Sequence, residues 1–89
     1  MKESLVTQLT ALADKNRLKI IQEICKRGII TCADAEEITG LSQPTTSHHI
    51  KILIDAGLVD GKKNGRHLDM SINKTHFESI SKILKSLAA

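Results

Sequence analysis

Aromatic residues are almost absent from this chain of 89 residues, which has no tryptophan or tyrosine and a single phenylalanine, Phe77. Proteins that bind RNA or single-stranded nucleic acid stack bases on aromatic side chains. Phe77 lies in an apolar pattern near the end of the chain, so it offers no stacking platform. The composition therefore argues against a single-strand binder.

Long apolar segments are also missing. No run is long enough to cross a membrane, and the pair Leu5 and Val6 is too short for the apolar core of a secretory signal. The two cysteines do not make a disulfide framework, which fits a reducing compartment. We therefore expect a cytoplasmic protein without a membrane partner.

Catalytic and cofactor-binding patterns are lacking as well. No nucleophile, base and orienting acid form a set, and there is no glycine-rich phosphate loop. His48 and His49 are adjacent, so on a helix they point about 100° apart and cannot easily share an ion. His48 can contact DNA, whereas His49 borders the buried side, where a packing role is expected. We expect no enzyme and no cofactor.

What the sequence does have is the pattern of a small, mainly α-helical module. Its length predicts one domain spanning residues 1–89, with a core modest enough to favour association with a second copy. Hydrophobic spacing and capping residues predict about five helices plus a small β-hairpin, with no linker or repeat. The expected helices cover residues 3–13, 14–27, 31–40, 42–56 and from 73 or 75 onward, with a short strand at Ile29 and Ile30. The second helix is expected to bury Leu18, Ile20, Ile21, Ile24 and Cys25.

The third and fourth expected helices form a helix-turn-helix pattern. Thr31 and Asp34 make a start similar to a capping box, and this helix ends at Gly40. The next helix begins with Ser42 as its N-cap and Pro44 in its first turn, where a missing N–H costs nothing. The spacing predicts that the third expected helix braces the fourth against DNA.

The fourth expected helix has opposite apolar and polar faces. The apolar stripe consists of Ile50, Leu53, Ile54 and Gly57. The opposite side carries Pro44, Ser47, His48, Lys51 and Asp55. Short polar side chains crowd its first turn, where a helix in a major groove presents them to base edges. We therefore interpret it as a DNA recognition helix that Gly57 ends.

A β-hairpin is expected after this helix. The segments 58–62 and 67–72 flank a Lys63-Asn64-Gly65-Arg66 turn, and Asn-Gly between strand-like runs is the strongest short hairpin signal. Lys62, Lys63 and Arg66 concentrate positive charge at its tip, which suits contact with phosphates or a minor groove. A solvated charged loop is the alternative, but beside a recognition helix we favour a DNA-contacting wing.

Two motifs of this chain closely resemble the ArsR family of bacterial winged-helix repressors. The family pattern Ser-x-Pro-x-x-Ser-x-His-Leu-x-x-Leu-x-x-Ala-Gly-Leu-Val is matched by Ser42, Pro44, Ser47, His49, Ile50, Leu53, Ala56, Gly57, Leu58 and Val59, with Ile50 in place of leucine. Upstream, residues 12–21 are similar to the family's Leu-Ala-Asp-Pro-Thr-Arg-Leu-x-Ile-Leu, with Asp14 as the cap and Lys15 where the family often has proline. The resemblance implies a winged helix-turn-helix repressor.

The first and last expected helices carry apolar seams. These seams consist of Leu5, Leu9 and Leu12 in the first helix and of Phe77, Ile80, Leu84 and Leu87 in the last. Packing onto the chain's own core is one interpretation, but two such helices are more than so small a domain needs to bury. The resemblance implies that they form a homodimer interface. Two recognition helices about 34–36 Å apart would then read a palindromic operator.

Many proteins that this chain resembles release DNA when a metal or an oxidant binds. Cys32 lies near the position where their arsenic and cadmium sensors carry a Cys-x-Cys pair, but Ala33 and Asp34 follow it. The last helix offers only His76, so we expect no metal site. Cys25 is expected to be a buried structural thiol, and a redox pair with Cys32 would need a Cα separation below about 7 Å. The inducer is unknown from sequence.

These patterns predict a sequence-specific regulator of transcription, a homodimeric repressor, that binds double-stranded DNA. The alternative is a winged-helix module for protein assembly without specific DNA binding, against which the positive charges argue mildly. The expected DNA-contacting residues are Gln43, Thr45, Thr46, Ser47, His48, Lys51, Lys62, Lys63 and Arg66.

Overall fold

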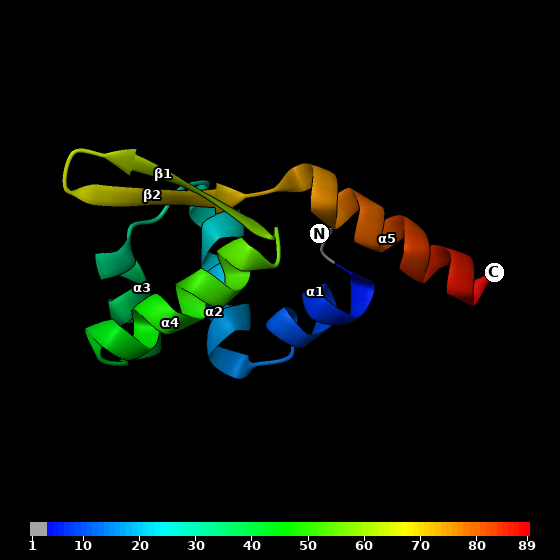
Figure 1. Cartoon of the computed structure of the whole chain (residues 1–89), viewed down its shortest axis with the longest axis horizontal. Coiled ribbons are helices and arrows are strands. Elements are labelled where there is room, and N and C mark those ends of the chain that lie inside the picture. The colour runs from blue at the N-terminus through cyan, green and yellow to red at the C-terminus, as the bar shows by residue number, and fades with distance from the viewer. Residues whose placement is uncertain (1–3) are drawn as a thin grey trace.

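The computed structural model describes residues 4–89 and has five helices and one hairpin within that range. In chain order these are α1 (Leu5–Leu12), α2 (Lys15–Arg27), α3 (Cys32–Thr39), α4 (Gln43–Asp55), β1 (Val59–Asn64), β2 (His67–Ile72) and α5 (Lys74–Ala88). The molecule is elongated, at 43 × 27 × 23 Å, with the tip of the hairpin and the end of α5 at opposite ends of the long axis (Figure 1). The predicted architecture is confirmed.

Side-chain caps determine where the helices begin. The N-cap residues, each of which accepts a backbone N–H, are Ser4, Asp14, Thr31, Ser42 and Asn73. The predicted capping box is present in full, because Thr31 Oγ1 accepts the N–H of Asp34 at 3.3 Å and Asp34 Oδ2 accepts the N–H of Thr31 at 2.9 Å. The predicted start of the first helix, Glu3, lies outside the described residues. Local chemistry thus fixes the ends of these helices.

The core lies between α2, α4 and β2. Its largest fully buried apolar side chains are Ile20, Ile24, Ile30, Leu53, Leu58, Met70 and Val59. The prediction that α2 also buries Leu18 and Cys25 is wrong, because Leu18 is 42% exposed and Cys25 is exposed. The buried stripe of α2 is centred between Ile20, Ile21 and Ile24, and both residues lie roughly 90° or more around the helix from that centre.

The hairpin is a two-stranded antiparallel sheet in which Val59 pairs with Ile72 and Asn64 pairs with His67. Asn64 therefore ends β1, and the two central turn residues are Gly65 and Arg66, one position later than the expected Asn-Gly turn. Gly65 has a φ of 65°, and glycine at the first central position is what a type II′ turn requires.

The expected strand at Ile29 and Ile30 is reduced to a single bridge. Ile30 pairs with Met70 through two backbone hydrogen bonds of 2.9 and 3.1 Å, and its side chain is buried. Ile29 is 58% exposed and takes no part. This bridge connects the segment just before α3 to β2 of the hairpin.

Candidate nucleic-acid interface

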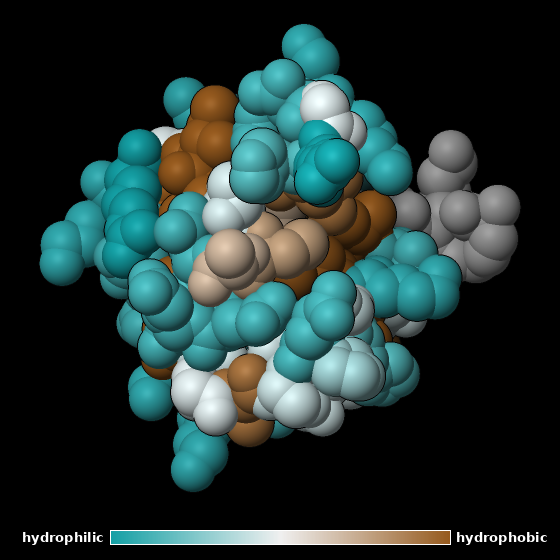
Figure 2. Space-filling model, turned by 90° about the vertical axis from the view of Figure 1, so that its left-hand side faces the viewer, coloured by the Kyte–Doolittle hydropathy of each residue, from teal (hydrophilic) through white to brown (hydrophobic). Residues whose placement is uncertain are grey.

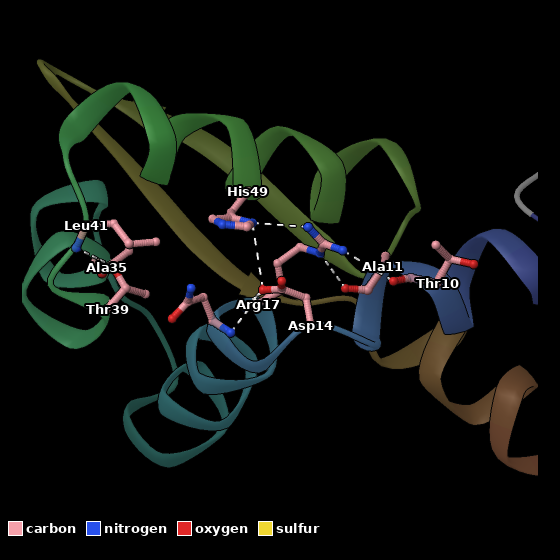
Figure 3. Close-up of polar contacts among 9 residues, drawn as sticks. Thr10, Ala11, Asp14, Arg17, Ala35, Thr39, Leu41 and His49 are labelled. Carbon is pink, nitrogen blue, oxygen red and sulfur yellow. Dashed lines mark hydrogen bonds and ion pairs between the residues drawn. The ribbon is translucent and has the colours of Figure 1, made fainter.

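The turn between α3 and α4 is held by the side chain of Thr39. Its hydroxyl donates to the carbonyl of Ala35 at 2.9 Å and accepts the N–H of Leu41 at 3.2 Å (Figure 3). Gly40 follows α3 with a left-handed backbone, and α4 begins three residues later at Gln43. The two helices are therefore joined by a short, internally bonded turn, as in a helix-turn-helix.

The outward face of α4 is polar and open to solvent. The exposed side chains in its first half, all predicted to face DNA, are Gln43, Thr45, Ser47 and His48, and Lys51 follows one turn later. Ser42 caps the helix and also donates to Thr45 Oγ1 at 3.0 Å. The start of α4 lies at the end of the molecule that also carries the wing tip (Figure 1). Figure 2 shows this end as mostly hydrophilic, with apolar atoms in its middle and smaller apolar patches at the upper left and at the bottom.

Thr46 is a correction to the predicted contact set. It is 1% exposed, and among the described residues its Oγ1 has no hydrogen-bond partner. Thr46, Ile50 and Leu53 follow one another at spacings of four and three, so Thr46 belongs to the inward stripe of α4. A residue on this stripe cannot reach a base edge, and the expectation that it faces the groove is wrong.

Lys51 forms an ion pair on the outward face. Its Nζ donates to Asp55 Oδ2 at 3.1 Å, and both side chains are more than half exposed. An exposed pair of this kind contributes little, typically about 0–1 kcal/mol, so Lys51 is free to exchange it for a phosphate. The carboxylate of Asp55 lies near the end of the same face and disfavours close approach of the DNA backbone there.

The wing carries Lys62, Lys63 and Arg66, all exposed. Because residues in a strand alternate between faces, Lys63 shares its face with Gly61, and Lys62 lies on the opposite one. A Cβ on Gly61 would lie 3.1 Å from Ile54 Cδ1, so the Gly61 face is the one that packs against α4.

Lys62 pairs across the strands with Asp69, whose carboxylate accepts from Asn64 Nδ2 at 3.1 Å. This carboxylate offsets the positive charge on the face of the wing away from α4. Within residues 4–89, neither Lys63 nor Arg66 forms an ion pair with a carboxylate, so the positive charge of the wing is concentrated at these two side chains.

The apolar seams of α1 and α5 are only partly covered. Leu5, Leu12 and Phe77 are half-buried, and the residues that remain exposed are Leu9, Leu84 and Leu87, the last at 74%. A groove of about 460 Å³ runs between the two helices and is lined by Leu9, Leu12, Phe77 and Leu84 among others. Ile80 also lines this groove, but it is only 4% exposed because it packs in the chain's own core.

A polar cluster that joins α1, α2 and α4 was not predicted (Figure 3). Arg17 Nε donates to the carbonyl of Ala11 at 2.7 Å, Nη2 donates to that of Thr10 at 3.3 Å, and Nη1 lies 3.1 Å from His49 Nδ1. Gln8, which is buried, donates to the carbonyl of Ala56 at 3.5 Å. The sequence signal was a polar residue on an apolar stripe, since Gln8 lies three residues after Leu5 and Arg17 four before Ile21.

The two cysteines are free thiols, and Cys25 is exposed rather than buried as expected. Burial raises the pKa of the half-buried Cys32 thiol, and the nearby Glu36 carboxylate raises it further. Within residues 4–89, no group of three or more His, Cys, Asp or Glu side chains is placed to hold a metal ion. No helix in this part of the chain is long and apolar enough to cross a membrane.

This arrangement, in which α1 and α2 precede a helix-turn-helix that is followed by a β-hairpin and by α5, is the winged helix-turn-helix fold. The family described as bacterial regulatory protein, arsR family, matches residues 14–60. The chain belongs to this ArsR family, as the motifs predicted.

The chain is similar in sequence to repressors of resistance operons. The chain is 38% identical over 79 residues to a probable mercury resistance operon repressor from Streptomyces lividans, covering 89% of this chain and 62% of the relative. It is 35% identical to an arsenical resistance operon repressor from Staphylococcus xylosus, covering 92% of this chain and 78% of the relative. The chain thus spans less than two thirds of the length of the first relative.

Among solved structures, an ArsR family transcriptional regulator superposes with a TM-score of 0.85 at 25% identity, covering 99% of this chain and 93% of that one. The match extends beyond the family motif to α5 and the wing. Together, the family match, the relatives and this structure place the chain among the transcriptional regulators of the ArsR family.

Proposed function

We propose that this chain is a homodimeric transcriptional repressor that binds a palindromic double-stranded operator in the cytoplasm. The observation that carries the proposal is the exposed polar face of α4 beside a wing tip whose positive charge is not offset. A helix with a polar outward face and a basic wing supply the two kinds of contact that sequence-specific binding needs, to base edges and to phosphates.

The two kinds of contact fall to different residues. Gln43 and Ser47 stand on the exposed start of α4 and read bases, with His48 beside them. Lys63 and Arg66 bind phosphate or enter a minor groove, where sequence matters less. We assign the exposed residues Thr45, Lys51 and Lys62 to the edge of this surface.

Dimerisation uses the seam of α1 and α5. Helices α1 and α5, which carry the exposed leucines of this seam, lie on the side of the molecule away from the wing tip, so a partner can cover them without blocking the start of α4 (Figure 1). A second copy would bury Leu9, Leu84 and Leu87 and present two recognition helices on one face.

Selection of duplexes from a random pool tests this function. The purified chain is expected to enrich a palindrome whose half-sites lie about one helical turn, or 34–36 Å, apart. A matched selection with Gln43→Ala should enrich a different base at one position in each half-site. Enrichment of no motif by the unaltered chain would contradict the proposal and would favour a winged-helix module for protein assembly.

A further inference from the structure

Arg17 is the one side chain of the cluster that contacts both neighbouring helices. Its guanidinium donates to the carbonyls of Thr10 and Ala11, the two residues that precede the last residue of α1. It also faces the imidazole of His49 in the middle of α4 (Figure 3). The planar guanidinium presents its donors in a fixed fork, so a single rigid group contacts both helices at once. No local pattern requires this, because Arg17 and His49 are 32 residues apart.

The charges around this contact favour it. The end of a helix carries a partial negative charge on its unpaired carbonyls, which suits a guanidinium at the end of α1. The carboxylate of Asp14 accepts the backbone N–H of Arg17 at 2.9 Å, and its negative charge attracts the Arg17 guanidinium. His49 is 13% exposed at its side chain, and because Arg17 can only donate, the imidazole accepts through Nδ1.

A second contact acts between the same two helices. The buried amide of Gln8, in α1, donates to the carbonyl of Ala56 at the end of α4, at 3.5 Å. The helix that carries part of the dimer seam is therefore tied to the recognition helix at two points along α4. These ties lie away from the outward face that meets DNA.

We propose that Arg17, through His49, is a positioning residue that sets the direction of the recognition helix relative to α1. The inference rests on the proposed function, because α1 belongs to the proposed dimer seam and α4 to the proposed DNA surface. In a dimer, a change in the angle between α1 and α4 is applied twice, once in each protomer. It alters the separation of the two recognition helices while leaving each one able to dock in a groove.

This separation of effects gives a test with two probes. The first is the palindromic duplex recovered by selection, and the second is the same duplex with one half-site scrambled. Arg17→Gln and His49→Leu should each lose about tenfold in affinity for the palindrome, the size expected for residues coupled in one hydrogen-bond network, and less than about twofold for the half-site. Lys19→Gln, which removes the same charge from an exposed position on α2, should leave both affinities unchanged.

A conservative rescue separates positioning from packing. His49→Asn retains an acceptor where Nδ1 stands, so it should restore the palindrome affinity to within about twofold of the unaltered chain. Thermal unfolding at the same protein concentration reports the folded fraction of every variant, and the ratio of the two affinities does not depend on that fraction.

Three results would overturn the inference. Equal losses of affinity for both duplexes would mean that the residues act on stability or contact DNA directly. A lower salt slope for Arg17→Gln would then indicate direct contact with DNA. If His49→Leu left the ratio of the palindrome affinity to the half-site affinity unchanged, His49 would have no positioning role. Failure of the unaltered chain to prefer the palindrome over the half-site would instead overturn the proposed function itself, and the positioning role with it.

Discussion

Replacement of Thr46 by valine is expected to stabilise the protein. The two side chains have nearly the same shape, and the hydroxyl of Thr46 is buried without a partner among the described residues. Burying an unpaired hydroxyl costs about 1–3 kcal/mol in proteins. Thr46→Val should therefore raise the free energy of unfolding by about 1 kcal/mol, which corresponds to a rise in Tm of about 4–8 °C for a domain of this size.

The assay is thermal or urea unfolding at one fixed protein concentration, because the stability of a dimer depends on concentration. Thr46→Ser is the matched control: it keeps the hydroxyl and loses one buried methyl group, so it should destabilise by about 1 kcal/mol. Neither change should alter which bases are preferred in DNA, since the side chain faces inward. A loss of stability in Thr46→Val, or a changed base preference, would refute the reasoning.

Three further changes test the wing and the capping box. Lys63→Ala with Arg66→Ala should weaken binding to all duplexes and reduce the salt slope by about 2, one for each lost phosphate contact, measured by titration at several salt concentrations. Gly61→Val should destabilise the protein by about 1–3 kcal/mol in urea unfolding, because even a Cβ added at Gly61 would lie only 3.1 Å from Ile54 Cδ1. Asp34→Ala should cost about 0.5–1 kcal/mol at neutral pH, and unfolding measured against pH should show this difference vanish in acid.

The acid behaviour follows from the direction of the Asp34 pKa. The backbone N–H of Thr31 holds the pKa of this carboxyl below its ordinary value, with further lowering by the Thr31 hydroxyl and Arg27. As the pH falls, Asp34 therefore takes up its proton at a lower pH in the folded state than in the unfolded state. The stabilisation by the Asp34 carboxylate is fully present above about pH 4. It is lost as the pH falls through the lower pKa of the folded state. A difference that persisted in strong acid would contradict this cause.

Controls for the other two changes lie nearby in the sequence. Lys62→Ala should reduce the salt slope less than Lys63→Ala, because Asp69 already offsets its charge. Gly61→Ala should cost less than Gly61→Val, since the ends of two flexible side chains need move only slightly. Equal slopes for the two lysines would show that the face of the wing does not matter.

Helix ends and the outward face of α4 were predictable because short-range chemistry decides them. A cap such as Ser42 or Asp14 acts within three residues, and the spacing of Ile50 and Leu53 fixes which side of the helix is buried. The same rule, applied to every residue of the first turn, would have placed Thr46 inside.

The features that were predicted wrongly or missed are those that depend on tertiary packing. The width of the buried stripe on α2, which leaves Leu18 and Cys25 outside, depends on where β2 and α4 lie. The Arg17–His49 contact joins residues far apart in the sequence, and spacing along one helix carries no information about it.

The central claim is tested most directly by equilibrium binding of the purified chain to the duplex from just upstream of its own gene, against a scrambled duplex at the same salt concentration. Two protomers per site and a preference on the order of a thousandfold for the upstream duplex are the expected results. Equal and weak affinity for the upstream, scrambled and selected duplexes would contradict a dimeric, sequence-specific repressor.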